Sequence, residues 1–206
     1  MSSYKNLPLP STVNNGGLYL NNRGIKSMPE HSVRFGENKK GFDALVSIVS
    51  DENNVPCYVH LTYLKDGKKA PIDNAKILKS LQNDNVLIQS KSLAVKMFKA
   101  GKILGIAEGI ETALSARDRY GLPVWSVCNA GFMRKFLAPV GVEKLVIYAD
   151  NDYSGTGLAA AFDCANKNFM NRKNTTLKEI EIIWLDSIGD FNDNELTETR
   201  NHILRR

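Results

Sequence analysis

The sequence has few cysteines and no long apolar segment, and both absences exclude classes of protein. Cys57, Cys128 and Cys164 lie far apart with no CxxC pair, which excludes a disulfide framework or a zinc ribbon built by this chain alone. We expect all three to be small buried residues in a reducing compartment. No apolar run approaches the ~20 residues of a membrane helix, and the start, MSSYKNLPLP, lacks the basic-then-apolar order of a signal peptide. These absences predict a soluble, cytoplasmic protein without a membrane partner.

Positive charge is unevenly distributed along the chain. The 206 residues carry a net charge of +5. Residues 1–100 hold 14 Lys and Arg against 8 Asp and Glu, whereas residues 101–206 hold 13 against 14. A basic lobe beside a neutral lobe that concentrates carboxylates suits a nucleic-acid substrate held near a cation-dependent centre. A well-solvated, lysine-rich surface would give the same charges, so charge alone leaves both interpretations open.

The first half of the chain is predicted to form an irregular arm followed by a small antiparallel sheet. Residues 1–17 are rich in Ser, Asn, Pro and Gly, which indicates little regular structure. GLYLNNRGI predicts a short helical turn closed by Gly24, and SVRF, FDALVSIVS and VPCYVHLTYL have the β-branched and aromatic residues of strands. Turns are expected at residues 51–54 and 65–68. Residues 18–100 are therefore interpreted as a basic α+β lobe.

The second half alternates short apolar runs with helix-like stretches. The apolar runs are ILGIA, VWSVC, LVIYA and IEIIWL. Nearly continuous apolar strands separated by helices are typical of a parallel sheet covered on both faces. We therefore predict an α/β domain with βαβαβαβ order over residues 101–195, followed by a C-terminal tail at 196–206.

Carboxylates follow three of the four predicted strands. Glu108 comes directly after the first strand, and Asp150 and Asp152 follow the third. The stretch after the fourth strand holds three more, Asp186, Asp190 and Asp193. Because the carboxyl ends of parallel strands meet at one edge of a sheet, we expect these side chains to converge there. Their repulsion would be relieved by a cation, and an oxygen-only ligand set favours Mg²⁺ or Mn²⁺ over zinc.

Helix capping is the other interpretation of two of these carboxylates. Asp is a common N-cap residue, and a helix is predicted to begin near Gly155. An isolated Asp150–Asp152 pair would be assigned to capping. The presence of Glu108 and Asp193 at neighbouring strand ends favours a metal site instead.

Two separated motifs resemble the signature of the Toprim domain. Glu108-Gly109 follows one strand, and the stretch from Asp150 to Gly155, DNDYSG, follows a later one. Four longer segments are similar to segments of Toprim primases of phages, plasmids and mobile elements: IAEGIETALSA, LPVW, YADNDYSGTG and GDFND. YLNNRGI and HLTYLKDGKKA resemble segments that precede Toprim in those primases, so the resemblance covers residues 18–195.

The resemblance implies a Toprim-type, Rossmann-like parallel sheet and assigns roles to its residues. Glu108 would be the acid/base carboxylate, and Asp150 and Asp152 the metal-binding pair. Asp190 and Asp193 would form a third acidic patch that helps to place Mg²⁺ or Mn²⁺. The candidates for contact with phosphate or nucleotide are Gly109, Asn129 and Gly155.

The chain also departs from the primase pattern. Thr112 stands where bacterial primases usually have a second acidic residue, and Glu111 precedes it. A one-residue shift turns a helical side chain by about 100°, so we favour a structural salt bridge for Glu111 over a role in the site. The sequence has no zinc-ligand quartet and no GxxxxGK[ST] phosphate loop. No zinc is therefore expected, and a separate helicase or zinc-binding protein is a candidate partner.

Basic and aromatic residues of the first lobe are the candidates for holding a nucleic-acid strand. Tyr19, Tyr58 and Tyr63 could stack bases, although packing is the commoner role of tyrosines on strands. Lys39 and Lys40 add positive charge, and Arg23 ranks first because it lies in YLNNRGI. The candidates are Arg23, Arg34, Lys65, Lys68 and Lys69.

These observations predict a DNA primase-like nucleotidyltransferase. Its partners would be single-stranded DNA as template and ribonucleoside triphosphates as substrates, joined into an RNA primer during the replication of a phage, plasmid or mobile element. Two alternatives stay open. The same acidic edge could serve a metal-dependent Toprim nuclease, or the chain could be a catalytically silent module that binds or regulates single-stranded nucleic acid.

Overall fold

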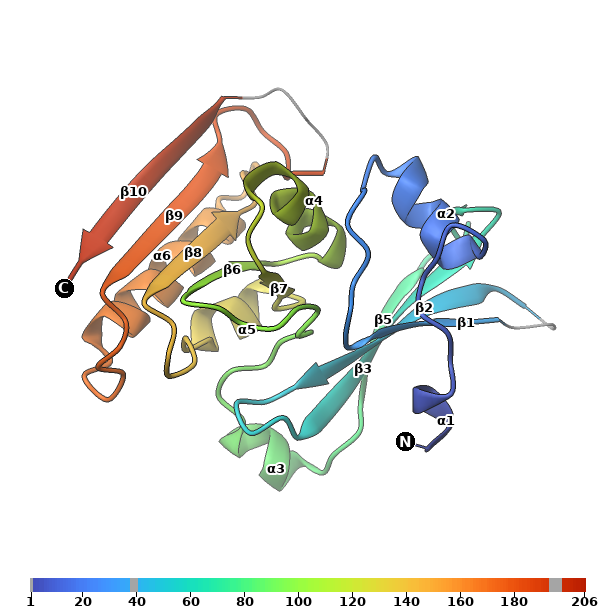
Figure 1. Cartoon of the computed structure of the whole chain (residues 1–206), viewed down its shortest axis with the longest axis horizontal. Coiled ribbons are helices and arrows are strands. Elements are labelled where there is room, and N and C mark those ends of the chain that lie inside the picture. Colours follow the sequence, from blue (N-terminus) through green and yellow to red (C-terminus); the bar gives the residue numbers. More distant parts are fainter. Residues whose placement is uncertain (1, 38–40, 193–197) are drawn as a thin grey trace.

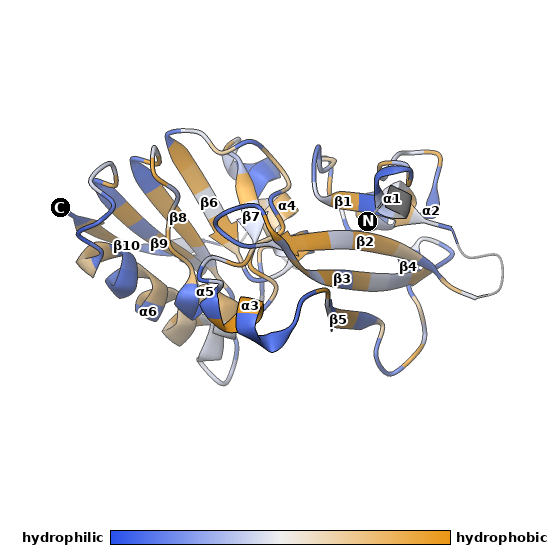
Figure 2. Cartoon of the chain, turned by 90° about the horizontal axis from the view of Figure 1, so that it is seen from below, coloured by the Kyte–Doolittle hydropathy of each residue, from blue (hydrophilic) through white to orange (hydrophobic). Residues whose placement is uncertain are grey.

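Two sheets lie side by side in the computed structural model, which describes residues 2–37, 41–192 and 198–206 (Figure 1). The first sheet belongs to an N-terminal lobe and the second to a C-terminal lobe. In Figure 2 the central strands of both sheets are largely apolar. Among the described residues, no helix combines the length and apolar character needed to cross a membrane.

The N-terminal lobe is an antiparallel sheet flanked by short helices. Its strand order is β1-β2-β3-β4, and β5 also pairs with β3. The strands are β1 (Val33–Gly36), β2 (Asp43–Ser50), β3 (Pro56–Lys65), β4 (Lys68–Lys69) and β5 (Lys76–Ser80). The helices are α1 (Ser2–Lys5), α2 (Asn15–Asn22) and α3 (Asp84–Gln89). The predicted strands and both predicted turns are confirmed.

The N-terminal arm is more ordered than its composition indicated. Residues 1–17 were expected to be irregular, yet α1 lies within them and α2 begins at Asn15. Asn14 starts α2, because its Oδ1 accepts hydrogen bonds from the backbone N–H of Gly17 and of Ser11. Gly24, with φ +74°, follows the helix as predicted.

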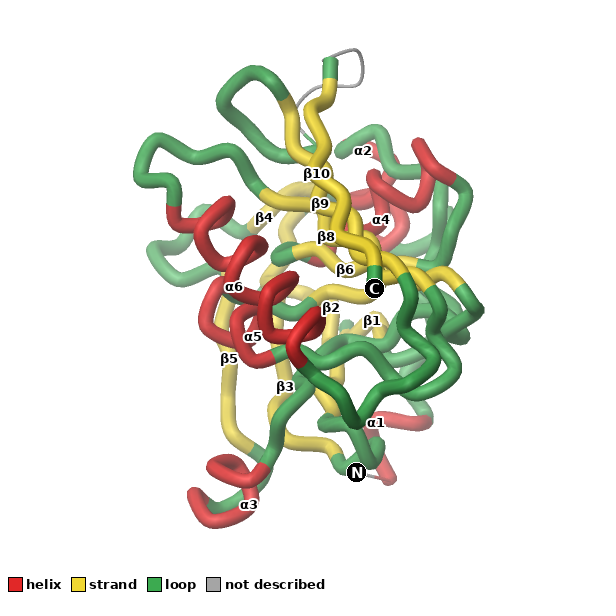
Figure 3. Tube along the Cα trace, turned by 90° about the vertical axis from the view of Figure 1, so that its left-hand side faces the viewer, coloured by secondary structure: helices red, strands yellow, loops and turns green. Residues whose placement is uncertain are grey.

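The C-terminal lobe is a mostly parallel sheet with helices on both faces. Its strand order is β10-β9-β8-β6-β7, and only β10 runs antiparallel to its neighbour. The strands are β6 (Ile103–Ala107), β7 (Val124–Ser126), β8 (Lys144–Ala149), β9 (Glu179–Leu185) and β10 (Thr199–Arg205). The helices are α4 (Ile110–Tyr120), α5 (Ala130–Lys135) and α6 (Thr156–Met170). Figure 3 shows α5 and α6 on one face of the sheet and α4 on the other.

The last strand is the main departure from the predicted order of elements. Residues 196–206 were expected to be a tail, but β10 pairs along the whole of β9, from Thr199 opposite Leu185 to Arg205 opposite Glu179. Most of its side chains are exposed, so the segment lacks the apolar pattern that marks the inner strands. Side-chain contacts add to the backbone pairing, because Arg205 Nε lies 2.9 Å from Glu179 Oε2.

One apolar cluster crosses the junction of the lobes. It contains Tyr19 and Leu20 of α2 together with Leu114 of α4 and Tyr148 of β8. A second cluster fills the space between the parallel sheet and helices α5 and α6. All three cysteines are free thiols. Cys57 and Cys164 are buried as expected, whereas Cys128 is half-buried.

Candidate active site

The parallel sheet has its topological switch point between β6 and β8. From β6 the chain first moves to β7 on one side and then returns to β8 on the other. The register pairs Ala107 with Tyr148, so Glu108 leaves β6 beside the residues that lead into Asp150. Neighbouring strands are about 4.8 Å apart. Ligands of open α/β sheets bind at such a point, beyond the carboxyl ends of the strands.

Glu108 is a half-buried carboxylate that faces charges of both signs. Burial raises its pKa above the ordinary value, and the negative charge of Asp152 raises it further. The positive charges of Arg134 and Lys76 act in the opposite direction. The backbone is fixed nearby, because the Ser126 hydroxyl donates to the Glu108 carbonyl oxygen at 2.8 Å. Glu108 and Asp152 are therefore electrostatic neighbours across the switch point.

Asp152 organises the loop that follows β8. Its carboxylate accepts hydrogen bonds from Ser154 Oγ at 2.6 Å and from the backbone N–H of Thr156 and Gly157 at 3.1 and 3.0 Å. These hydrogen bonds, with that of Ser154 the largest contribution, lower the pKa of Asp152. The capping interpretation thus holds for Asp152, whose carboxylate accepts hydrogen bonds from the first two N–H groups of α6. Capping leaves its charge in place, and that charge acts on Glu108.

A glycine that the sequence analysis did not single out brings α6 close to this loop. A Cβ added at Gly157 would lie 2.5 Å from the carbonyl oxygen of Asp150. Gly155, which was predicted, is needed for another reason: its φ of +68° is costly for other residues, although a Cβ there meets nothing within 4 Å. Two glycines therefore shape the same turn, one by conformation and one by close approach.

We predict that Gly157→Ala lowers the free energy of unfolding by about 2 kcal/mol, because the added methyl forces the start of α6 away from Asp150. Urea denaturation of the variant and the wild type measures this. Gly101→Ala is the matched control, since a Cβ there meets its first neighbour at 3.6 Å. Equal losses in the two variants would show that close packing is not the cause.

The other two predicted phosphate contacts are helix N-caps. Gly109 begins α4 with an ordinary φ of −83°, so its backbone does not require glycine. Asn129 begins α5, and its Oδ1 accepts a hydrogen bond from the backbone N–H of Phe132 at 2.8 Å. Both lie at the carboxyl ends of their strands, as the sequence predicted.

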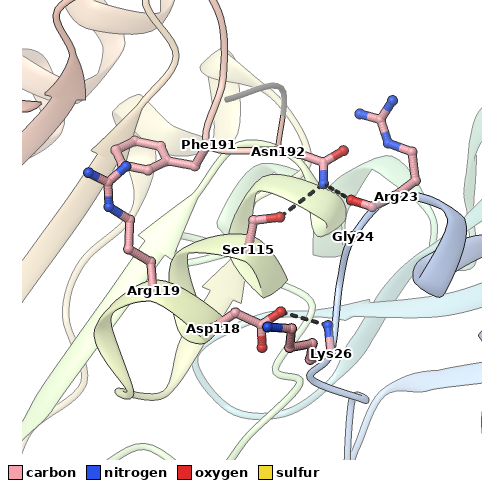
Figure 4. Close-up of a pocket in the computed structure, with 8 residues that line it drawn as sticks. All are labelled: Arg23, Gly24, Lys26, Ser115, Asp118, Arg119, Phe191 and Asn192. Carbon is pink, nitrogen blue, oxygen red and sulfur yellow. Dashed lines mark hydrogen bonds between the residues drawn. The ribbon is translucent and has the colours of Figure 1, made fainter. Parts of the chain in front are cut away.

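The segment after β9 contacts both the loop after β8 and the N-terminal lobe. Asn151 and Gly189 exchange two backbone hydrogen bonds of 3.0 and 2.9 Å. Asn192 Nδ2 donates to the carbonyl oxygen of Arg23 at 2.9 Å and to Ser115 Oγ at 3.0 Å (Figure 4). The charge of Asp190 acts on Tyr19 and Lys69 of the first lobe. Asp193, Lys39 and Lys40 lie outside the described residues.

The described carboxylates are suited to a cation but do not form a ready-made cage. In the part of the chain that the structure describes, no three His, Cys, Asp or Glu residues are grouped as a metal site. Glu108, Asp150 and Asp152 nevertheless supply only oxygen donors, and the repulsion between Glu108 and Asp152 is what a cation relieves. Mg²⁺ is often bound by one or two carboxylates, with water and substrate phosphates completing its ligands. The residues present fit that kind of ion.

Glu111 is the centre of a buried polar network that joins the two lobes. Tyr19 donates its hydroxyl to Glu111 Oε1 at 2.5 Å, and Lys76 Nζ lies 2.9 Å from Oε2. Burial opposes the charge of Glu111, but the Lys76 ammonium and the Tyr19 hydroxyl lower its pKa to about 2. The salt-bridging role favoured for Glu111 is confirmed. Its partners precede it by 35 and 92 residues, and nothing in the sequence indicates that they meet Glu111.

Lys76 carries positive charge from the first lobe to the acidic edge of the second. Its charge lowers the pKa of Glu108 and, after the larger effects of burial, those of His60 and Lys69. Burial and Lys76 together bring the pKa of His60 to about 4, which leaves that imidazole neutral at pH 7. Lys76 is thus the site residue that sequence reasoning missed.

The predicted nucleic-acid contacts divide into two groups. Arg23, Lys68 and Lys69 line one hollow of about 350 Å³ beside Tyr19. Lys65 is exposed at the end of β3 and precedes Lys68 of this hollow by three residues. Arg34 lies on β1 and packs over the ring of Tyr4 at 5.6 Å, so it is not part of the hollow.

The tyrosines proposed to stack bases are engaged within the protein. Tyr19 is 2% exposed and hydrogen-bonded to Glu111, which rules out its stacking on a bound base. The ring of Tyr58 lies 5.4 Å from that of Phe132. Packing therefore explains both residues, whereas Tyr63 stays half-buried on β3.

A second hollow, which Arg23 also lines, lies where the lobes meet (Figure 4). Its walls come from the linker after α2, from α4 and from the segment after β9. Asp118 of α4 accepts hydrogen bonds from the backbone N–H of Lys26 at 2.7 Å and of Ser27 at 2.9 Å. These contacts fix the linker against α4.

Comparisons with known proteins agree with this architecture. Residues 103–200 match the family model of the Toprim domain, and residues 7–87 match a model described as a domain of unknown function. No curated protein matches the chain.

Solved structures of primases have a similar fold. The primase fragment of the bacteriophage T7 primase-helicase aligns with a TM-score of 0.51 and 16% identity over 85% of this chain and 63% of that fragment. A DNA primase domain from Pseudomonas aeruginosa gives 0.52 and 11% over 91% and 69%. The zinc-binding and RNA polymerase domains of the Aquifex aeolicus primase give 0.53 and 13% over 88% and 52%. The chain therefore spans between half and seven-tenths of the length of these structures.

Proposed function

We propose, from the premise that residues 103–200 form a Toprim domain, that the chain is a primase-like catalytic core. It would join ribonucleoside triphosphates into an RNA primer on a single-stranded DNA template. One observation carries the proposal: the parallel register brings Glu108 of β6 beside the Asp150–Asp152 loop of β8 at the switch point of the sheet. The similarity to solved primases supports the fold in which this happens.

The carboxylates would act on the cation and on the attacking group. Glu108, Asp150 and Asp152 would hold Mg²⁺ or Mn²⁺, and Asp190 would support the same edge. A divalent cation there supplies stabilisation of the negative charge that moves during phosphoryl transfer. Glu108 would also be the acceptor for the proton of the attacking 3′-hydroxyl.

The basic residues would act on phosphates and on the template. Lys76 is paired with Glu111, and its charge also acts on Glu108, so it would add positive charge near a bound nucleotide phosphate. Arg23, Lys68 and Lys69 extend positive charge from that edge over the first lobe and would bind the phosphates of the single strand. Gly109, Asn129 and Gly155 begin three helices at the strand ends, where backbone N–H groups attract anions.

A priming assay tests the proposal. Purified protein is incubated with single-stranded DNA, labelled ribonucleotides and Mg²⁺ or Mn²⁺, and the products are resolved by length. Labelled products that require both template and divalent cation support a primase. Shortening of labelled DNA or RNA without added nucleotides would instead indicate a nuclease. Metal-independent binding of single-stranded DNA without turnover, unchanged in Asp150→Asn, would indicate a silent binding module.

We predict that the Lys68→Ala, Lys69→Ala double variant binds single-stranded DNA about threefold to tenfold more weakly than wild type at moderate salt, because two phosphate contacts are lost. The slope of log K against log salt should fall by about 1.4, or roughly 0.7 for each contact. Fluorescence anisotropy across a salt series measures both quantities. Lys178→Ala removes a lysine paired with Glu143 on the other lobe and should leave the slope unchanged. Equal slopes in all three proteins would show that Lys68 and Lys69 of β4 do not contact the DNA.

A further inference from the structure

A groove lies away from the acidic edge, near the amino ends of the parallel strands. It consists of two adjoining hollows of about 460 Å³ each, which share Glu52, Asn53 and Lys91. The first hollow is lined by Pro139 and Val140, which precede β8, and by Asn171, Lys173 and Asn174, which precede β9. An occupant of the groove would thus leave the carboxyl ends of the strands open.

Each hollow has one strongly exposed apolar residue. In the first hollow this is Val140, which is 79% exposed, whereas the aromatic residues Trp125 and Phe136 that line it are buried. The second is lined by α3, where Ile88 is 81% exposed. Figure 1 shows α3 at the lower edge of the molecule, beside the loop between β2 and β3. Two solvent-exposed apolar residues at one groove are what a docking segment would cover.

The charges around the groove favour an anionic occupant. Lys91, Lys96 and Lys173 line its walls, and Lys91 and Lys173 form no ion pair with the described residues. Both carboxylates of the groove accept hydrogen bonds from backbone N–H groups. Asp51 Oδ1 accepts from those of Asn53 and Val55, and Glu52 Oε2 accepts from those of Lys91 and Ser92. These carboxylates keep their charges, and both act on Lys96. The groove still holds three lysines against two carboxylates, and Lys173 extends the positive charge beyond them.

Lys96 joins the apolar and charged parts of the groove. Its ammonium donates to the Asp51 carbonyl oxygen and to Asn54 Oδ1, both at 2.7 Å. It also lies 5.4 Å from the centre of the Trp125 ring. Trp125 in turn donates its Nε1–H to the Phe98 carbonyl oxygen at 2.7 Å. These contacts hold the Lys96 ammonium in place at the wall of the first hollow, where its charge is available to a carboxylate of a partner.

We infer that this groove binds an extended acidic peptide segment of another protein, with one apolar side chain in each hollow and carboxylates over Lys91 and Lys173. The two hollows are open and arranged in a row, which suits a segment of chain better than an enclosed small molecule. The inference is independent of the proposed catalytic function, because none of these residues contributes to the acidic edge.

Fluorescence anisotropy with a fluorescein-labelled peptide, Glu-Leu-Asp-Glu-Phe-Asp, tests the inference on the full chain. We expect saturable binding with a Kd below about 1 mM that weakens as salt is added. The Lys91→Glu, Lys173→Glu double variant should raise the Kd about tenfold, through the reversal of two exposed charges. Val140→Asp should weaken binding as well. Lys91, Lys173 and Val140 are all exposed, so folding of both variants is expected to be unaffected and is checked by circular dichroism.

Matched controls separate this groove from non-specific attraction. Lys99→Glu changes an exposed lysine that does not line the groove and should leave the Kd unchanged. A peptide with Ala in place of Leu and Phe should bind more weakly, which supports the apolar hollows. No binding up to about 1 mM, or equal weakening by Lys99→Glu, would overturn the inference. So would displacement of the peptide by oligo(dT) or a chain dimer that Val140→Asp dissociates, since these would assign the groove to nucleic acid or to a second copy.

Discussion

Glu108→Gln and Asp150→Asn are each expected to lower the rate of primer synthesis by at least about 100-fold, the low end of the contribution of a positioned acid or base. Glutamine keeps the size of Glu108 but neither accepts a proton nor carries the charge that attracts a cation. Asparagine at position 150 likewise removes one charged oxygen ligand. The initial rate of ribonucleotide incorporation on single-stranded DNA with Mn²⁺ measures both effects.

A carboxylate at the end of the neighbouring strand provides the control for this prediction. Asp186 follows β9 and is paired with Arg200 on β10, so Asp186→Asn removes the same charge without touching Glu108. Its rate should stay within about twofold of wild type, as for a surface ion pair of small energetic weight. Thermal unfolding of all three variants shows whether they are folded. Equal rates in wild type, Glu108→Gln and Asp150→Asn would show that neither carboxylate takes part in the reaction.

Glu111→Gln is expected to produce the largest change in the pH dependence of stability. The folded pKa of Glu111 is about 2, against an ordinary value of 4.5, so the folded state holds the charged form more firmly than the unfolded state does. This stabilisation is complete above about pH 4.5 and is lost as the pH falls toward 2, and it amounts to about 3 kcal/mol. Glu111→Gln should therefore be less stable than wild type at pH 7 and lose less stability between pH 4.5 and pH 2. Urea denaturation at several pH values measures the difference.

Removal of the cationic partner gives an independent test of the same network. Lys76→Met leaves Glu111 buried with the Tyr19 hydroxyl and a backbone N–H as its donors. It should lower the free energy of unfolding at pH 7 by about 2 kcal/mol, less than for a fully buried pair because Lys76 is partly exposed. Lys79→Met removes an exposed lysine of the same strand and should change it by less than about 0.5 kcal/mol. Similar losses in both variants would mean that the ion pair adds no stability.

The strands around the switch point were predictable because their signal is local. β6 and β8 are buried along nearly their whole length, so the sequence shows them as apolar runs. The carboxylates were predictable for the same reason, since Glu108 and Asp150 directly follow those runs. β10 was missed because an exposed edge strand needs no apolar face, and its pairing with β9 supplies the missing stabilisation.

The contacts that complete the candidate site depend on pairings between distant segments. Lys76 meets Glu111 across 35 residues, and Asn192 meets Arg23 across 169. Arg23 and Asn192 each lie in a segment that resembles Toprim primases, but nothing in the sequence indicates that the two residues of either pair meet. For Asp152 the sequence allows two roles, a helix cap and a metal ligand. The structure confirms the cap. The charge of Asp152 still acts on Glu108, so capping does not exclude metal binding.

The ion pair between Lys76 and Glu111 also limits how this protein can be recombined. Lys76 belongs to the N-terminal lobe and Glu111 to the C-terminal lobe. Each lobe alone would therefore carry one charged residue without its partner. A chimera that grafts the C-terminal lobe onto a foreign N-terminal lobe would inherit the carboxylate without its lysine. Such a hybrid needs a basic residue supplied at the position of Lys76, or a neutral one at 111, before its two halves can dock.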